Sequence, residues 1–178
     1  ANAAQLQMLR YQLNPHFLFN TLNAINALVR LGEGDKAERM IDQLSRFLRH
    51  SLDQEARPTA TLGEELEALR LYLDIEKVRF DDRLDVRFDV APAAQSAIVP
   101  SLILQPLIEN AVKYAISDSE DGGSIAIAAR IVGARLELSV TDSGPGMDAS
   151  ELGSKQRGIG LRNTIERLDT LYQGDYTL

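Results

Sequence analysis

Residues 2–31 have the apolar periodicity of one long amphipathic helix, and its apolar face is unusually wide. That face comprises Leu6, Leu13, Phe17, Leu18, Leu22, Ala24, Ile25, Leu28 and Val29. One partner helix would leave part of this face in water, whereas a four-helix bundle would cover it. The width therefore predicts a homodimer in which two helical hairpins form a bundle. The alternative is that the helix packs on the domain downstream.

Pro15 interrupts this helical pattern, beside the only histidine of the first forty residues. A proline in a helix interior costs about 3 kcal/mol through a lost hydrogen bond and a ring clash. We therefore interpret the segment around Pro15 as functional and His16 as the reacting group. His16 would point to solvent, and Asn20, one turn later, would lie on the same face.

A second helix is predicted after Gly32 and Gly34, which end the first one. Its inner stripe comprises Ala37, Met40, Ile41, Leu44, Leu48 and Ser51. The stretch Gln54–Thr59 follows as a short linker and hinge. We expect a helical hairpin domain over residues 1–58 and a second domain over residues 59–178.

Helical and strand patterns follow one another in the second half. The expected elements are a helix over 61–78, a strand over 84–90, a helix over 101–116, a strand hairpin over 124–141 and a helix over 158–172. This order predicts an α+β sandwich, with a sheet that has helices on one face.

The charge and the rare residues exclude several kinds of site. The formal net charge is −7 with acidic residues spread along the chain, which argues against a nucleic-acid-binding surface. There is no cysteine, so disulfides and thiolate metal sites are excluded, and two histidines argue against a zinc site. No apolar run has the length of a membrane span. Because the sequence starts without methionine and within a helical pattern, we expect an upstream part to be missing.

Gln105–Tyr114 is the first of three polar stretches that could carry chemistry. The amide oxygen of Asn110 suits Mg²⁺, and Lys113 could reach phosphate oxygens. On a regular helix Glu109, Lys113 and Ile116 would share one side. The alternative, favoured for this stretch alone, is a polar helix face with an ion pair.

Two glycine-bearing stretches follow. Asp142 ends a strand that we expect to be buried, before Gly144 and Gly146, so its carboxylate could accept a hydrogen bond from adenine. Gly158 and Gly160 stand at a helix start, where backbone N–H groups suit an anion. The alternatives are an ordinary turn and a flexible loop before a helix.

The order and spacing of these motifs resemble the LytS/YehU-type sensor histidine kinases, which have a GHKL (Bergerat) ATP-binding domain. QLNPHFLFNTLNAI resembles the phosphoacceptor motif, LEALRLYLDIEKVRF the connecting helix, LQPLIENAVKYA the N box, DSGPGM the G1 box and GIGLRNTIERL the G2 box. The resemblance implies a mixed sheet with helices on one face, and a last strand that is incomplete after Leu178.

The resemblance also implies roles for single residues. His16 would be the phosphoacceptor, Asn110 the Mg²⁺ ligand and Asp142 the adenine partner. The further nucleotide-binding positions would be Lys113, Tyr114, Gly144, Gly146, Arg157, Gly158, Gly160 and Leu161.

The general base is left open by the residue after His16. An acidic residue follows the phosphoacceptor in the best-known histidine kinase families, whereas this chain has Phe17. Glu109 is one candidate if the domains close. Alternatively no base is needed, because neutral imidazole has a free lone pair at pH 7. Asn20 could orient a water or position the imidazole.

The resemblance implies the cytoplasmic core of a bacterial inner-membrane sensor, working as a homodimer. MgATP would phosphorylate His16, and the phosphoryl group would pass to an aspartate of a response-regulator receiver domain. One alternative is a nucleotide-binding switch or dimerisation scaffold without kinase activity. Another is a GHKL ATPase that uses Glu109 and water.

Overall fold

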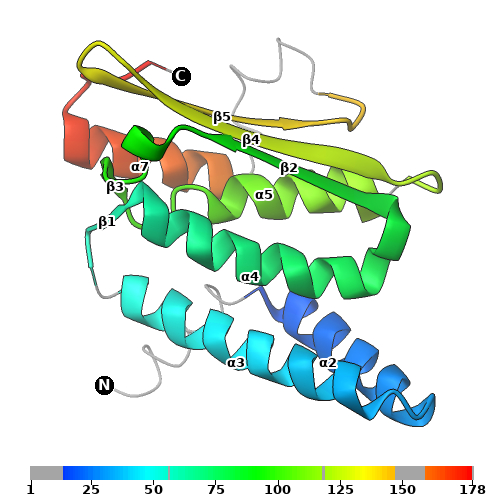
Figure 1. Cartoon of the computed structure of the whole chain (residues 1–178). Coiled ribbons are helices and arrows are strands. Elements are labelled where there is room, and N and C mark those ends of the chain that lie inside the picture. The colour runs from blue at the N-terminus through cyan, green and yellow to red at the C-terminus, as the bar shows by residue number, and fades with distance from the viewer. Residues whose placement is uncertain (1–13, 56, 118, 147–158, 178) are drawn as a thin grey trace.

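The computed structural model describes residues 14–55, 57–117, 119–146 and 159–177 (Figure 1). Its α-helices are α2 (Pro15–Arg30), α3 (Gly34–Glu55), α4 (Leu62–Phe80), α5 (Gln105–Ala111) and α7 (Ile159–Tyr172), with the π-helix η3 (Val112–Ser117) and the short 3-10 helices η1 (Asp81–Arg83) and η2 (Pro92–Ala94). Its strands are β1 (Thr59–Thr61), β2 (Leu84–Val90), β3 (Ile98–Pro100), β4 (Gly123–Val132) and β5 (Arg135–Asp142).

Helix α2 begins at Pro15, so the prediction of one uninterrupted helix over 2–31 is wrong at this point. Asn14 has non-helical backbone angles, and its side chain caps the helix by accepting a hydrogen bond from the Phe17 amide. Pro15 occupies the first helical position, where its missing N–H costs nothing. Pro15 therefore has a structural explanation, and the penalty of an interior proline does not apply.

Helices α2 and α3 form the predicted hairpin, and Gly32 turns the chain with a positive φ of 75°. Ala37, Met40, Leu44 and Ser51 are buried as expected. Ile41 is 51% exposed, so its assignment to the inner stripe is wrong. Phe47 of the same helix points into the core instead and is 2% exposed.

The linker after the hairpin is shorter than predicted. Helix α3 continues to Glu55 with Gln54 buried inside it, and Thr59 already starts β1. Helix α4 then begins with the capping box formed by Thr61 and Glu64. Gln54 and Thr59 thus belong to α3 and β1 and not to the expected hinge, and the domain division after residue 58 stays a prediction.

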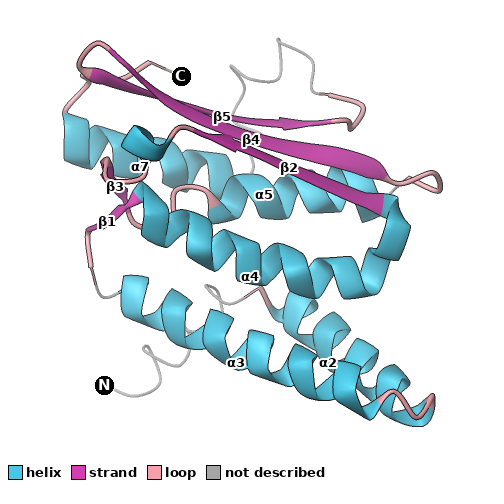
Figure 2. Ribbon diagram, viewed as in Figure 1, coloured by secondary structure: helices cyan, strands magenta, loops and turns pink. Residues whose placement is uncertain are grey.

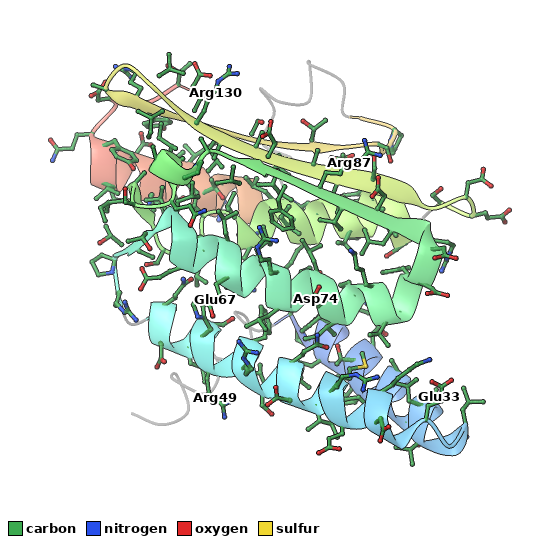
Figure 3. The ribbon with its side chains drawn as sticks, in the orientation of Figure 1. Glu33, Arg49, Glu67, Asp74, Arg87 and Arg130 are labelled. Carbon is green, nitrogen blue, oxygen red and sulfur yellow. The ribbon has the colours of Figure 1, made fainter. Side chains whose placement is uncertain are left out.

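The second half has a mixed three-stranded sheet in the order β2-β4-β5. Strand β2 pairs parallel with β4, and β4 pairs antiparallel with β5. Side chains alternate across the sheet, so Ile125, Ile127 and Ala129 are buried beneath it. Arg87 and Arg130 stand on the opposite, exposed side (Figure 3).

Helices α4, α5 and α7 all lie on one face of this sheet, as predicted (Figure 2). Helix α4 lies between the hairpin and α5 (Figure 1). It packs on α2 and α3 as well as on α5 and β2. Eleven of its residues are buried, whereas one amphipathic stripe would bury fewer. The position of α4 therefore fixes how the hairpin and the sheet layer are joined.

Candidate functional site

His16 is the second residue of α2, and its side chain is exposed, as the sequence predicts. The amide nitrogen of Asn20 lies 3.2 Å from Nδ1 and 3.1 Å from Nε2 of the imidazole. In the neutral imidazole one ring nitrogen carries a proton and the other a lone pair, so the tautomer decides which nitrogen accepts from the Asn20 amide. The side chain of Asn20 thus contacts the imidazole from one helical turn further along α2.

Phe17, the next residue, is buried and only 3% exposed. Its ring centroid lies 5.4 Å from that of Phe47 on α3 and 4.8 Å from that of Tyr72 on α4. This aromatic contact fixes the first turn of α2 against two other helices. A carboxylate at this position would be buried in an apolar cluster, which explains why an acid would not fit beside His16.

Glu109 lies on α5 and is connected to α2. Its Oε1 accepts a hydrogen bond from Gln105 Nε2 at 2.9 Å, and its Oε2 accepts one from Asn14 Nδ2 at 3.4 Å. Burial raises the pKa of Glu109, and these two hydrogen bonds partly offset the effect. Its role as a base stays a prediction, but both of its oxygens already have partners.

Asn110, Lys113 and Tyr114 follow along α5 and the π-helix η3. Asn110 is half-buried, and its side chain forms no hydrogen bond with the described residues. Lys113 and Tyr114 are exposed and contact each other, with Nζ 3.2 Å from the phenol oxygen. Ile116 is fully buried, so the expectation that it shares a side with Lys113 is wrong. The wider π turn changes the angular spacing, and such turns often occur at functional sites.

Asp142 ends β5 and is exposed, so the expectation of a buried strand end is wrong. Its Oδ1 accepts a hydrogen bond from the Gly144 amide at 2.8 Å. A Cβ on Gly144 would lie 2.7 Å from that oxygen and 3.2 Å from Ala115 Cβ, so a larger residue does not fit. Gly146 has a positive φ of 75°, which favours glycine. The turn after β5 therefore packs closely on η3.

The last predicted stretch is described only in part. Arg157 and Gly158 lie outside the described residues, and Gly160 and Leu161 belong to the first turn of α7, without a described side-chain environment. Helix α7 contacts α5. The α5–η3 segment thus touches both the turn after β5 and the helix that begins at the third stretch, while the nucleotide-binding roles stay predictions.

Two known protein families match successive parts of this chain. The family described as "Histidine kinase" matches residues 4–84, and the one described as "Histidine kinase-, DNA gyrase B-, and HSP90-like ATPase" matches residues 97–178. The chain belongs to the histidine kinases. Helices α2, α3 and α4 lie in the first matched region, and α5 and α7 lie in the second.

Individual histidine kinases resemble nearly the whole chain. The sensor histidine kinase YesM of Bacillus subtilis is 36% identical over 175 residues, which are 98% of this chain and 30% of that protein. The sensor protein LytS of Staphylococcus haemolyticus is 34% identical over 178 residues, 95% of this chain and 30% of that protein. The predicted LytS-type resemblance is confirmed. The chain spans about a third of the length of these relatives.

A solved structure titled "Bacterial Phosphotransferase" has the same fold. Its TM-score is 0.53 at 15% identity, and the match covers 96% of this chain and 88% of that one. Among the described helices, none combines the length and the apolar character that crossing a bilayer requires.

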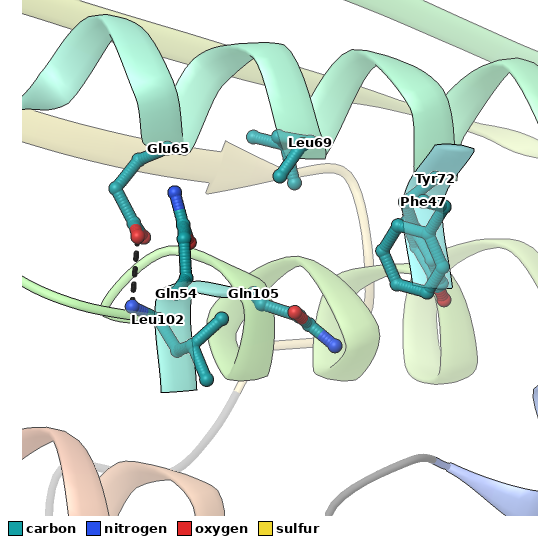
Figure 4. Close-up of a pocket in the computed structure, with 8 residues that line it drawn as sticks. Phe47, Gln54, Glu65, Leu69, Tyr72, Leu102 and Gln105 are labelled. Atoms are coloured by element: carbon teal, nitrogen blue, oxygen red, sulfur yellow. Dashed lines mark hydrogen bonds between the residues drawn. The ribbon is translucent and has the colours of Figure 1, made fainter. Parts of the chain in front are cut away.

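The sequence did not indicate three buried polar residues of this kinase chain. Glu65 of α4 is 3% exposed, and its carboxylate accepts hydrogen bonds from the amides of Leu102, Ile103 and Leu104, just before α5 (Figure 4). Tyr72 and Glu76 lie further along α4, where Glu76 pairs with Arg79. All three fall at positions of a helical pattern that apolar residues usually occupy, and that is the only signal they give.

Proposed function

We propose that this chain is the kinase core of a sensor histidine kinase, and that MgATP phosphorylates it on His16. The observation that carries the proposal is the exposed imidazole of His16 in the first turn of α2, on a chain whose other half matches an ATPase family. A phosphoryl group on His16 would lie at the positive end of the helix dipole, which favours negative charge.

The reaction needs positioning more than covalent help from the protein. A lone pair of the neutral imidazole attacks the γ-phosphorus of ATP, and the bond from that phosphorus to the bridging oxygen breaks. ADP leaves, and the proton on the other ring nitrogen is lost to solvent. No acceptor for a proton on the attacking nitrogen is required, so Phe17 after His16 is compatible with the chemistry.

The nucleotide would bind beside α5 and η3. The amide of Asn110, free of partners among the described residues, fits one ligand position of Mg²⁺, which usually keeps several waters and substrate phosphates. The described residues hold no group of three or more histidine and acidic side chains that could bind a metal alone. Mg²⁺, when bound, would neutralise phosphate charge. Lys113 would contact phosphate, and Asp142 would accept a hydrogen bond from adenine.

The ATPase alternative requires Glu109 to activate water. Both oxygens of this carboxylate already accept hydrogen bonds, from Gln105 and Asn14. We therefore favour direct attack by His16. A scaffold without kinase activity remains the second candidate, and the same experiment distinguishes it.

The partners follow from the family and from the surface of the hairpin. Leu22, Val29 and Ile41 are more than half exposed in the single chain, which supports burial in a homodimer. We propose that the phosphoryl group passes to an aspartate of a response-regulator receiver domain. The cytoplasmic location, as part of a longer bacterial membrane sensor, stays a prediction.

Incubation with γ-labelled ATP and Mg²⁺ tests the function. We expect label that is lost in acid and kept in base, as a phosphohistidine requires. His16→Gln should abolish the label while nucleotide binding persists. Binding of ATP to the wild-type chain without labelling would support the scaffold, and steady phosphate release that is unchanged in His16→Gln would support the ATPase.

A further inference from the structure

The side-chain amide of Asn14 makes two hydrogen bonds, one through its oxygen and one through its nitrogen. Its Oδ1 accepts a hydrogen bond from the Phe17 amide at 3.3 Å, which caps α2. Its Nδ2 donates to Glu109 Oε2 at 3.4 Å, across 95 residues of sequence. The residue that caps the helix of His16 is therefore also hydrogen-bonded to the helix of Asn110.

Glu109 offers a fixed partner for this contact. Its other oxygen is held by Gln105 of the same helix, and the side chain is only partly accessible. On α4, Glu76 lies close enough to Glu109 for their charges to interact, and Glu76 itself is paired with Arg79. Asn14, the cap of α2, is the partner of Glu109 from the hairpin.

We propose that Asn14 is a positioning residue that holds His16 alongside the nucleotide site through Glu109. The inference rests on the proposed kinase activity. His16 follows Asn14 by two residues, so its Cα lies within about 7 Å of the tethered residue. Asn110 follows Glu109 directly in α5. We call the hydrogen bond between Asn14 and Glu109 the tether. Within one chain, it joins the turn that carries His16 to the turn proposed to bind Mg²⁺.

Capping alone does not explain an asparagine here. Serine and aspartate cap helices about as well as asparagine, but neither can donate an amide hydrogen bond to a carboxylate. The aromatic contacts of Phe17 hold the same turn independently. Loss of the tether should therefore leave α2 folded while His16 gains freedom to move.

Asn14→Ser separates the two roles, because serine keeps the cap and removes the tether. We expect the rate of His16 labelling at saturating ATP to fall about tenfold, because misplacement of reacting groups slows transfer. The apparent KM for ATP and the melting temperature should stay close to wild type. Asn26→Ser, the same change at an exposed position of α2, is the matched control and should label normally.

Exchange of donor and acceptor gives an independent readout. Asn14→Asp places a carboxylate against Glu109 and should slow labelling. The double variant Asn14→Asp/Glu109→Gln should be labelled as fast as Glu109→Gln alone, or faster. The amide introduced on α5 can then donate a hydrogen bond to the carboxylate introduced before α2. Equal losses in both backgrounds would overturn the inference, as would wild-type labelling by Asn14→Ser; if Glu109→Gln is inactive, the serine variant decides.

Chemical phosphorylation by phosphoramidate separates this inference from the proposed function. It reaches His16 without ATP, so Asn14→Ser should be labelled as fast as wild type. A wild-type chain labelled by phosphoramidate but never by MgATP would refute the kinase activity itself. Wild type labelled by MgATP with Asn14→Ser equally fast would refute only the tether.

Discussion

Glu76 of α4 lies near Glu109 of α5, and only 1% of its side chain is exposed. Burial raises its pKa from 4.5 to about 7, although Arg79 lowers it through charge and a hydrogen bond. The folded state therefore holds a proton more tightly than the unfolded state. Burial also raises the pKa of Glu65 and of Glu109. All three carboxyl groups therefore change the pH dependence of the free energy of unfolding in the same direction.

The free energy of unfolding should fall as the pH rises from 4.5 to 7, because the folded state must then bury a charge. Glu76 alone contributes a decrease of up to about 3 kcal/mol. Glu76→Gln should flatten this pH dependence, measured by urea unfolding across the range. Asp74→Asn, an exposed site on the same helix, is the control; equal pH dependence in Glu76→Gln and wild type would contradict the assignment.

At the residue scale, the sequence contains the signal for the start of α2. Asparagine followed by proline is a typical cap and first helical residue. The apolar periodicity continues on both sides of Pro15, and for this reason the predicted helix started before Pro15. The exposure of His16 and its closeness to Asn20 were predictable, because both follow from local helical spacing.

The turn before α5 depends on a side chain from another helix. Leu102 has a φ of 57°, a conformation that costs about 1–3 kcal/mol for a residue other than glycine. Glu65 stabilises it by accepting hydrogen bonds from three successive amides at 2.7, 3.0 and 3.3 Å. Arg167 of α7 bonds the Ser101 carbonyl in the same turn. The start of α5 is thus fixed by α4 and α7 together.

Glu65→Ala should lower the free energy of unfolding by about 3 kcal/mol, because three successive amides, two of them buried, lose their acceptor. It should also weaken ATP binding, since α5 carries Asn110 and leads into Lys113. Thermal unfolding and nucleotide titration measure the two effects. Glu67→Ala removes an exposed glutamate of the same helix and should change neither; similar effects of both substitutions would contradict the role of Glu65.

Elements with strong local signals were predictable, including α4 with its capping box and the hairpin of β4 and β5. Strands β1 and β3 were not predictable, because three residues each form a strand only by pairing with one another across the fold. The helix expected over 101–116 starts at Gln105 and ends in a π-helix. Contacts of Glu65 and the packing of η3, which the local sequence does not show, cause both differences.

At the scale of the whole molecule, the hairpin leaves apolar surface uncovered. Leu22 and Val29 on α2 are 54% and 59% exposed. A charge at either position should oppose burial in a dimer. Leu22→Glu should raise the dimer dissociation constant about tenfold or more, measured by analytical ultracentrifugation. Ile131→Glu, a similar change on β4, should leave it unchanged; an unaffected Leu22→Glu dimer would exclude this face.

The contact between Asn14 and Glu109 also predicts which protomer is phosphorylated. It joins His16 to the α5 helix of its own chain, so transfer should occur within one protomer. Dimers mixed from His16→Gln and Asn110→Ala chains should then remain unlabelled. Labelling of the Asn110→Ala chain in the mixture would show transfer between protomers.

His16 is the point on which the whole account depends. Trypsin should release it in the peptide of residues 11–30, between Arg10 and Arg30. Mass spectrometry at neutral pH, after incubation with MgATP, should find the mass of one phosphoryl group on this peptide and localise it to His16. A fully active preparation in which this peptide stays unmodified, or in which the phosphoryl group lies on another residue, would contradict the account.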